Sequence, residues 1–195
     1  MHAVTPRLDL SPLTLDDVDD VFEVYSNPDT WTHMPEGRYT SPEQARDLII
    51  RSLASLDQWG LGEWGVRIGA DAAEPDLPEG TFIGAAGMKM SPGGVWNLGY
   101  RLSPTSWGRG FAHEAARAAV AAAAEAAPEV PVTARVLANN PASIRVIERL
   151  GLELLWEGHV AASVPGTDGE QPPLRRVYTD RELSPEAYAW IVENA

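Results

Sequence analysis

The chain has 195 residues and a mass of 21.1 kDa, which suits one domain and excludes a many-unit repeat array or a large multidomain enzyme. It contains no cysteine, so a disulfide scaffold, a thiolate metal site and a cysteine nucleophile are excluded. The formal net charge of −13 makes a free nucleic-acid-binding module a poor hypothesis, because such a module needs a basic face, and we expect no nucleic-acid partner.

Residues 1–102 predict four strands and two helices. The strands are expected at residues 7–13, 63–68, 81–90 and 95–102. The first helix follows Thr14 and ends near Pro28, and the second begins at Ser41 with proline at its first helical position. Their expected apolar faces are Val18, Val21, Phe22 and Tyr25 for the first helix, and Leu48, Ile49, Leu53 and Leu56 for the second. Residues 29–40 and the acidic residues 69–80 are expected to be loops.

The second half predicts three helices and three more strands. Helices are expected at residues 108–127 and 141–150, the latter capped by Gly151, with a last helix starting at Ser184. Strands are expected at residues 131–137, 152–160 and 174–179. Successive strands joined by loops favour antiparallel pairing, whereas the later strand–helix–strand unit favours a parallel crossover. We therefore expect an α+β (mixed α/β) fold of about seven strands, and a single domain over residues 1–195.

No segment resembles a signal peptide or a membrane span. Residues 1–13 contain no apolar run of signal-peptide length, and the alanine-rich residues 115–127 are too short to cross a bilayer. We expect a cytoplasmic protein without a membrane partner.

Two strings imitate known motifs and fail on context. Residues 60–65 fit G-x-G-x-x-G, but the string precedes a strand and opens no helix, so it does not predict a dinucleotide site. His113-Glu114 begins like a zinc-protease motif, but Arg117 stands where the second histidine is needed. The other histidines form no ligand-spaced cluster, and we expect no metal.

One segment carries a mechanism of its own. A strand leads through Ser103-Pro104 to Trp107-Gly-Arg-Gly-Phe-Ala112, which opens the alanine-rich helix. Small residues at 108, 110 and 112 allow a ligand close to the backbone, and free N–H groups at a helix start favour a phosphate. Residues 99–151 also contain six arginines against four acidic residues, which is either surface variation or part of an anion site. The turn predicts anion binding, with Arg109 as an added cation. The alternative is that the glycines only allow tight strand–helix packing.

The sequence here resembles a known family. Gly108-Arg-Gly-Phe-Ala112, followed by Asn140-Pro-Ala-Ser-Ile-Arg-Val-Ile-Glu-Arg-Leu-Gly151, is similar to the GNAT superfamily of acetyl-CoA-dependent N-acetyltransferases. The Leu98-Gly-Tyr strand and the Trp-Gly-Arg-Gly turn resemble its RimJ/RimL-type branch. The resemblance extends from Arg7 to Tyr178, and it implies a GNAT-type, mostly antiparallel sheet flanked by helices.

The resemblance implies acetyl-CoA as cosubstrate and a set of residues that bind it. The turn would hold the pyrophosphate through backbone N–H groups, although Trp107 stands where arginine or glutamine is usual. Asn140 would meet the pantetheine arm, or cap the following helix, or do both. The strand ending at Leu102 would lie along the acetyl group and supply an oxyanion N–H. The full expected set is Leu102, Trp107, Gly108, Arg109, Gly110, Phe111, Ala112, Asn140, Ser143 and Arg145.

The catalytic residues implied by the resemblance are incomplete. Many members use a tyrosine acid at the position of Ile147, and the branch instead offers a serine, here Ser143, which could equally be a helix cap. The branch often has a glutamate base at the position of Asn97, and an amide cannot accept a proton in that role. Glu63, His33 and Glu157 are other candidates for the base, each with a surface or structural alternative.

The missing base favours an acceptor amine that is readily deprotonated. A lysine side chain has a pKa near 10.4, whereas a peptide α-amine has a pKa of about 7.7–8.0. We therefore expect a peptide or protein N-terminal α-amine, attacking acetyl-CoA directly because no cysteine is available to carry the acyl group. By resemblance, the loop with Trp31, His33 and Tyr39 would form the acceptor wall.

Two alternatives remain open. One is a detoxification acetyltransferase for a small cationic amine, which the acidic net charge would suit, and the other is an acyl-CoA-binding sensor without turnover. A homodimer is plausible by resemblance.

Overall fold

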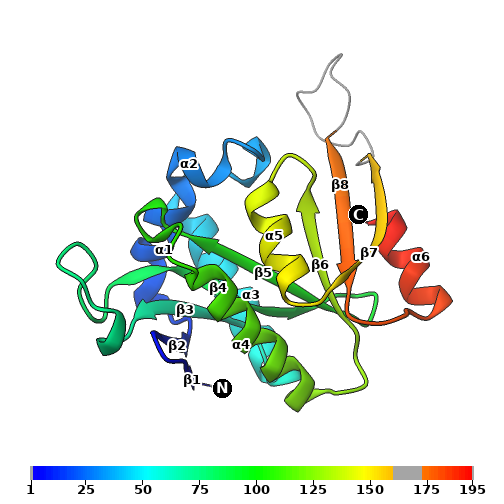
Figure 1. Ribbon diagram of the computed structural model, residues 1–195, viewed down its shortest axis with the longest axis horizontal. Coiled ribbons are helices and arrows are strands. Elements are labelled where there is room, and N and C mark those ends of the chain that lie inside the picture. The colour runs from blue at the N-terminus through cyan, green and yellow to red at the C-terminus, as the bar shows by residue number, and fades with distance from the viewer. Residues whose placement is uncertain (1, 160–172, 195) are drawn as a thin grey trace.

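The computed structural model describes residues 2–159 and 173–194, and Figure 1 shows its arrangement. In these residues eight strands form one sheet. The strands are β1 (Ala3–Val4), β2 (Leu8–Pro12), β3 (Glu63–Ile68), β4 (Phe82–Met90), β5 (Trp96–Leu102), β6 (Val132–Leu137), β7 (Glu153–His159) and β8 (Leu174–Thr179). The helices are α1 (Val18–Ser26), α2 (Pro28–Trp31), α3 (Pro42–Trp59), α4 (Phe111–Ala126), α5 (Pro141–Arg149) and α6 (Pro185–Glu193).

One parallel strand pair interrupts an otherwise antiparallel sheet. The strand order is β1-β2-β3-β4-β5-β6-β8-β7, and only β5 and β6 run parallel. Their pairing covers Trp96–Leu98 of β5, although β5 continues to Leu102 and β6 to Leu137. The two arrows therefore diverge toward their C-terminal ends in Figure 1. Beyond Leu98, one edge of β5 has no strand partner in the part of the chain that the structure describes, so its backbone groups are available to a ligand.

Helices cover both faces of the sheet. On one face α4 packs against β2, β4 and β5, and α5 packs against α4 and β6. The alanine-rich side of α4 is buried there with Trp96, Leu98 and Phe111. On the other face α1 and α3 enclose a second cluster that includes Leu13, Val21, Ile49 and Ala85. A smaller third cluster lies under α6, where Ile191 meets Val95 and Val177.

The structure confirms the predicted fold class and corrects several details. All seven predicted strands are present and β1 is additional; β7 ends at His159, and Val160 lies outside the described residues. The predicted loop at residues 29–40 contains α2 and a 3₁₀ turn, Pro35–Gly37. The α2 helix was not predicted, because four residues are too few to show an apolar period.

The predicted apolar face of α3 is wrong at its C-terminal half. Leu53 is 37% exposed and Leu56 is half-buried, whereas Ser52 is buried. The Ser52 hydroxyl accepts from the Glu63 N–H at 2.7 Å and donates to the Glu63 carbonyl at 3.1 Å. A small polar residue therefore brings α3 close to the start of β3 and fixes the backbone at Glu63.

Candidate active site

The predicted anion turn lies at the start of α4, beside the diverging end of β5. Gly108 and Gly110 both have positive φ, +77° and +83°, which L-residues other than glycine rarely adopt. No atom lies within 4 Å of the position of a Cβ on Gly108, so this part of the turn is open. The first N–H groups of the 16-residue α4 have no partner inside the helix. The turn therefore has the geometry and polarity of a phosphate-binding helix start.

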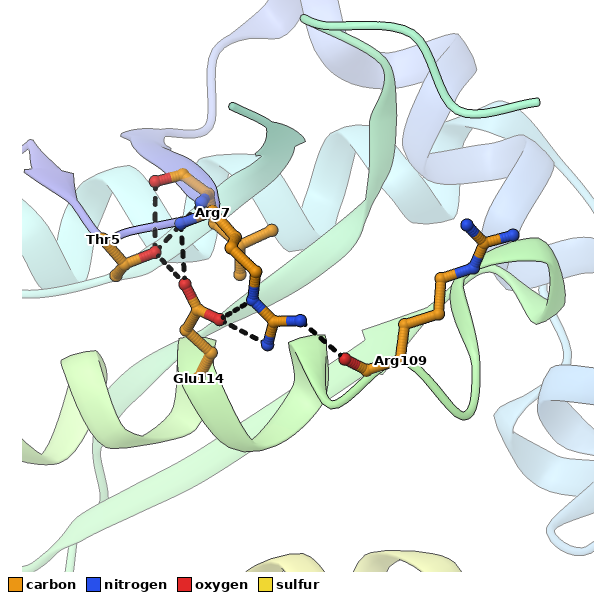
Figure 2. Close-up of polar contacts among 5 residues, drawn as sticks. Thr5, Arg7, Arg109 and Glu114 are labelled. Carbon is orange, nitrogen blue, oxygen red and sulfur yellow. Dashed lines mark hydrogen bonds and ion pairs between the residues drawn. The ribbon is translucent and has the colours of Figure 1, made fainter. Parts of the chain in front are cut away.

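A buried carboxylate in the first turn of α4 is tied to the N-terminal segment (Figure 2). Glu114 accepts from the Thr5 hydroxyl at 2.7 Å and from the Arg7 N–H at 3.0 Å, and its other oxygen lies 2.6 Å from Arg7 Nη2. Arg7 Nη1 also donates to the Arg109 carbonyl at 2.8 Å. Burial alone raises the pKa of Glu114, but the hydrogen bonds from Thr5 and Arg7 leave it below its ordinary value.

This network has two consequences for the turn. A free carboxylate at a helix N-terminus would compete with an anionic ligand for the positive end of the helix, and Arg7 neutralises it. By holding the Arg109 carbonyl, Arg7 also fixes the orientation of the peptide between Arg109 and Gly110. Its guanidinium stacks 4.8 Å from the centre of the Phe111 ring, which packs it behind the turn.

The side chain of Arg109, which the sequence predicts as an added cation, is engaged by two carboxylates in this structure. It forms ion pairs with Glu74 at 2.5 Å and Asp76 at 2.6 Å, both from the exposed loop between β3 and β4. Figure 2 shows it extending away from Arg7. Arg7 is thus a second cation beside the turn, held there by Glu114 and by the Arg109 carbonyl.

The other expected cofactor residues on this side differ in what they can offer. Leu102 and Phe111 are buried in the core, so only their backbone groups are available. Trp107 is half exposed, and its indole N–H donates to the Leu102 carbonyl at 2.9 Å. Ala112 is partly buried, and Arg145 lies exposed on α5.

The start of α5 lies across the divergence from β5. Asn140 Oδ1 accepts from the Ser143 N–H at 3.1 Å, which makes it a helix cap, and Asn140 Nδ2 donates to His33 Nε2 at 3.1 Å. The Tyr100 hydroxyl donates to the Ser143 carbonyl at 3.2 Å. Burial raises the pKa of Tyr100 to about 12, which makes its hydroxyl a poor acid. Ser143 thus faces β5 across the same gap.

A pocket of about 310 Å³ opens on the opposite face of β5. It is lined by Tyr25, Gly37, Tyr39, Leu48, Glu63, Lys89, Gly99, Tyr100 and Arg101. Its floor follows from strand register, because Glu63 on β3 is opposite Gly87 on β4, which is opposite Gly99 on β5. Two glycines in one row leave the floor without side chains. A Cβ on Gly99 would lie 3.6 Å from Glu63 Oε1, so the carboxylate reaches over β5.

Glu63 is the buried acid of this pocket. It is 5% exposed, and one carboxylate oxygen lies 3.1 Å from Lys89 Nζ. Its other oxygen, Oε2, has no hydrogen-bond partner among the described residues. Burial and the Glu63 charge both raise the pKa of Tyr25 and of Tyr39, which places both phenols close to this carboxylate. Glu63 thus has one buried carboxylate oxygen that no described residue engages.

The remaining predicted catalytic and acceptor residues divide into two groups. Asn97 is directly opposite Lys89, with its Oδ1 buried and unpartnered among the described residues, and Tyr39 lines the pocket. His33 contacts Asn140, and burial first and then the Arg101 charge lower its pKa. Trp31, by contrast, donates to the Ser26 carbonyl and stacks under Arg38. Glu157 pairs with Arg176 between β7 and β8, so neither Trp31 nor Glu157 lines the pocket.

Sequence reasoning missed four residues that the structure places at the site: Arg7, Tyr25, Lys89 and Arg101. The sequence predicts that Tyr25 lies on the apolar face of its helix, which is correct, but it does not show that the tyrosine also lines the pocket. Lys89 and Arg101 occupy alternate strand positions on the same face as Asn97, which strand periodicity could have shown. No local signal marks Arg7, because its partner Glu114 is 107 residues away.

Comparison with known proteins places this arrangement in a family. A model of the acetyltransferase (GNAT) domain matches residues 7–153. The uncharacterized N-acetyltransferase p20 of Bacillus licheniformis is 27% identical over 151 residues, which cover 76% of this chain and 80% of that protein.

Two solved structures share the fold. RimL, a ribosomal L7/L12 α-N-protein acetyltransferase in complex with coenzyme A, has a TM-score of 0.68 and 17% identity, covering 92% of this chain and 98% of its own. Spermidine N-acetyltransferase from Vibrio cholerae, in complex with CoA and spermine, has a TM-score of 0.67 and 16% identity, covering 89% and 95%.

The mixed sheet with its one diverging parallel pair is that of an acyltransferase. More particularly, the chain belongs to the GNAT acetyltransferase family, and it is an N-acetyltransferase that uses acetyl-CoA. In the part of the chain that the structure describes, no group of three or more His, Asp or Glu residues could hold a metal ion. No helix among those residues has the length and apolarity to span a membrane.

Proposed function

We propose that this acetyltransferase transfers the acetyl group directly to a primary amine held in the pocket beside Glu63, with the α-amine of a peptide or protein as the favoured acceptor. The observation that carries the proposal is the position of Glu63. Its carboxylate reaches over Gly99 through Oε1, its Oε2 has no hydrogen-bond partner among the described residues, and the other side of β5 faces the anion turn and Ser143. An acceptor and an acyl donor can therefore meet at one strand.

The cofactor half of the proposal rests on the turn and the strand edge. The N–H groups at residues 108–112 would bind the pyrophosphate of CoA, and the unpaired edge of β5 up to Leu102 would take the acyl arm. Asn140 keeps α5 in place by capping it, and Ser143 and Arg145 follow on that helix. The open space at Gly108 and the helix start behind it fit a phosphate.

The acceptor half assigns proton transfer to Glu63. Its Oε2 takes a proton from the bound ammonium group, and the neutral nitrogen then attacks the thioester carbonyl carbon. The C–S bond breaks, and we propose that the departing thiolate takes the proton of the Ser143 hydroxyl. The second proton of the attacking nitrogen then replaces it on Ser143, which leaves the neutral amide and the CoA thiol, and Glu63 releases its proton to solvent. Asn97 cannot accept a proton, so we assign it to orienting groups in the pocket. With no cysteine in the chain, no acyl-cysteine intermediate intervenes.

An α-amine suits this site for two reasons. A peptide α-amine is far more often neutral at pH 7 than a lysine side chain, so one shared carboxylate suffices as the base. The pocket also contains Lys89 and Arg101 beside a single acid, which is a poor environment for a polycationic amine. These observations favour the peptide acceptor over the small cationic one.

The experiment is an assay of CoA release with acetyl-CoA and a panel of amines that includes an N-terminal peptide and a lysine side chain. The thiol readout has no background from the protein, since the chain lacks cysteine. We expect Glu63→Gln to lower kcat about 10²–10⁴-fold, as for loss of a general base, with the affinity for CoA retained. We expect Gly110→Asp to abolish CoA binding by strain and charge repulsion.

Gly94→Asp is the matched control for the turn, because Gly94 also has positive φ (+70°) but lies in the open turn between β4 and β5. Unchanged CoA affinity in Gly110→Asp would refute the pyrophosphate assignment. A clear preference for lysine would refute the α-amine, and CoA binding without turnover of any amine would indicate the sensor alternative. We further propose a homodimer, no nucleic-acid partner and a cytoplasmic location, which sizing, binding and fractionation experiments would test.

A further inference from the structure

The acceptor pocket has one more positive charge than negative charge. Among the described residues that line it, Glu63 is the only acid, and Lys89 pairs with that acid at 3.1 Å. Arg101 lines the same pocket, and its positive charge is the one that Glu63 does not balance. The local excess of positive charge contrasts with a chain whose formal net charge is −13.

Arg101 is held in place by neutral groups. Its Nη1 donates to the Gly37 carbonyl at 2.7 Å, and its guanidinium lies 4.4 Å from the centre of the Tyr25 ring. No carboxylate of the described side chains forms an ion pair with it. A guanidinium has five N–H donors, so several remain for a ligand, in the fork geometry that matches a carboxylate.

The charges around the pocket do not cancel this excess. Asp47 and Arg51 of α3 both act on Tyr39 at the pocket wall, one acid against one base. Burial, and after it the Arg101 charge, lower the pKa of His33, so the positive charge of Arg101 also acts on that side chain. A half-buried cation without a counter-ion is costly, and an anionic ligand would remove that cost.

We propose that the acceptor carries a carboxylate next to its amine, and that Arg101 binds this carboxylate while Glu63 receives the amine. The inference rests on the proposed function, since it names the substrate class of the same pocket. Arg101 is then the specificity-determining residue, and it excludes polycationic amines by repulsion.

The strand geometry indicates where on the acceptor this carboxylate lies. Gly99 and Arg101 are two positions apart on β5, a separation of roughly 6.7 Å. The α-carboxylate of a free amino acid is only about 2.5 Å from its own amine, which is less than the spacing of these two strand positions. An acidic side chain in the first two residues of a peptide fits better, and a pocket of about 310 Å³ accommodates little more than such a segment.

The test compares three peptides that differ only at residue 2, with Asp, Asn or Lys, alongside free aspartate and spermidine. We expect kcat/KM for the Asp peptide to exceed that for the Asn peptide by about tenfold or more, with the Lys peptide and spermidine lowest. Free aspartate should fall below the Asp peptide. In Arg101→Gln the Asp-to-Asn ratio should collapse to within about twofold.

Arg38→Gln is the matched control, because Arg38 stacks on Trp31 and does not line the pocket; it should keep the wild-type ratio. Equal rates for the Asp and Asn peptides, a preference for Lys or spermidine, or an acidic preference that persists in Arg101→Gln would each overturn the proposal. A higher kcat/KM for free aspartate than for the Asp peptide would overturn the assignment of the carboxylate to a peptide.

Binding of the acetylated products, measured by calorimetry with CoA present, separates this inference from the proposed function. If no amine is turned over, the proposed function fails, yet the acetylated Asp peptide should still bind about tenfold more tightly than the Asn peptide. That difference should vanish in Arg101→Gln. Equal binding of the two products by the wild-type protein overturns the anionic site whatever the turnover.

Discussion

At the scale of single residues, Arg7 connects parts of the chain that are far apart in sequence. One guanidinium neutralises the buried carboxylate of Glu114, donates to the Arg109 carbonyl and stacks on Phe111. These contacts lie behind the anion turn, on the side away from a ligand. We therefore expect Arg7 to act on CoA binding through the shape of the turn, as a positioning residue.

Replacing Arg7 with glutamine should weaken CoA binding by about tenfold, because the Arg109–Gly110 peptide loses its anchor and Glu114 regains its influence on the helix start. Activity with S-acetylpantetheine, a donor without a pyrophosphate, should change much less. The two measurements are the Kd for CoA and the ratio of kcat/KM between the two donors.

Two further variants keep this prediction interpretable. Arg7→Gln also strands a buried carboxylate, at a cost of about 1–3 kcal/mol, and the double variant Arg7→Gln/Glu114→Gln removes that carboxylate. Arg117→Gln, on the exposed side of α4, is the control for a lost arginine. If both donors lose activity equally in the double variant, Arg7 has only a structural role.

The site was predictable where the signal is local. The glycines at 108 and 110, the Asn140 cap and the acidic candidate Glu63 are all visible in the sequence. The partners of these residues could not be predicted. From the sequence, Arg109 is a cation beside an anion-binding turn, and nothing local shows that it forms ion pairs with Glu74 and Asp76. Long-range pairing decides which charges are free, and only the register of the strands reveals it.

At the scale of elements, α4 depends on small side chains. Ala115, Ala116, Ala119, Ala122 and Ala123 are buried between the helix and the sheet. Alanine lets the helix axis approach β4 and β5 closely, which sets the height of the anion turn above the strand edge. The high alanine content that characterises this segment is therefore a packing requirement on one face of the helix.

Ala119→Leu should destabilise the protein by about 1–3 kcal/mol, because Ala119 is 1% exposed and the added carbons have no space. Ala121→Leu, on the exposed face of the same helix, should change the free energy of unfolding by less than about 0.5 kcal/mol. Chemical denaturation measures both variants. Equal effects at the two positions would show that α4 does not pack as described.

Element positions were predicted well and element faces less so. The long periodic segments form helices and strands where the sequence predicts them. The predicted parallel crossover is also present, through α4 between β5 and β6. The apolar face of α3 was misjudged at Leu53 because Ser52, a polar residue, occupies the buried position by bonding to the backbone of Glu63. Apolar periodicity cannot detect a helix face that is anchored by a hydroxyl.

At the scale of the whole molecule, the two sheet faces share their strands. Ala85 packs into the cluster under α1 and α3, and its neighbour Ala86 packs into the cluster under α4. Val95 and Trp96 divide in the same way between the α6 cluster and the α4 cluster. If the strands under one cluster unfold, a neighbouring cluster therefore also becomes exposed to solvent.

We accordingly predict one cooperative unfolding transition, as expected of a single domain. The calorimetric and van't Hoff enthalpies should agree, and tryptophan fluorescence and far-UV circular dichroism should give coincident curves. Ile191→Ala, which removes a fully buried side chain under α6, should lower the free energy of unfolding by about 2–5 kcal/mol and keep a single transition. A separate low-temperature transition in Ile191→Ala would mean that the α6 region unfolds independently.

The net charge of the molecule differs in sign from the charge around its pocket. An acidic chain suggested a cationic acceptor, yet the pocket places Lys89 and Arg101 beside one carboxylate. The many acids lie elsewhere on the surface, where they set solubility and leave the local field to the nearest side chains.

The glycine floor of the pocket offers a way to re-engineer the enzyme. A Cβ at Gly99 would sit at ordinary contact distance, 3.6 Å, from Glu63 Oε1, and Gly99 does not have positive φ. Alanine at this position would therefore be tolerated by the backbone while narrowing the entrance by one methyl group. Directed libraries of small side chains at residue 99 could grade the bulk of the accepted amine while leaving the residues that bind or activate it unchanged in sequence.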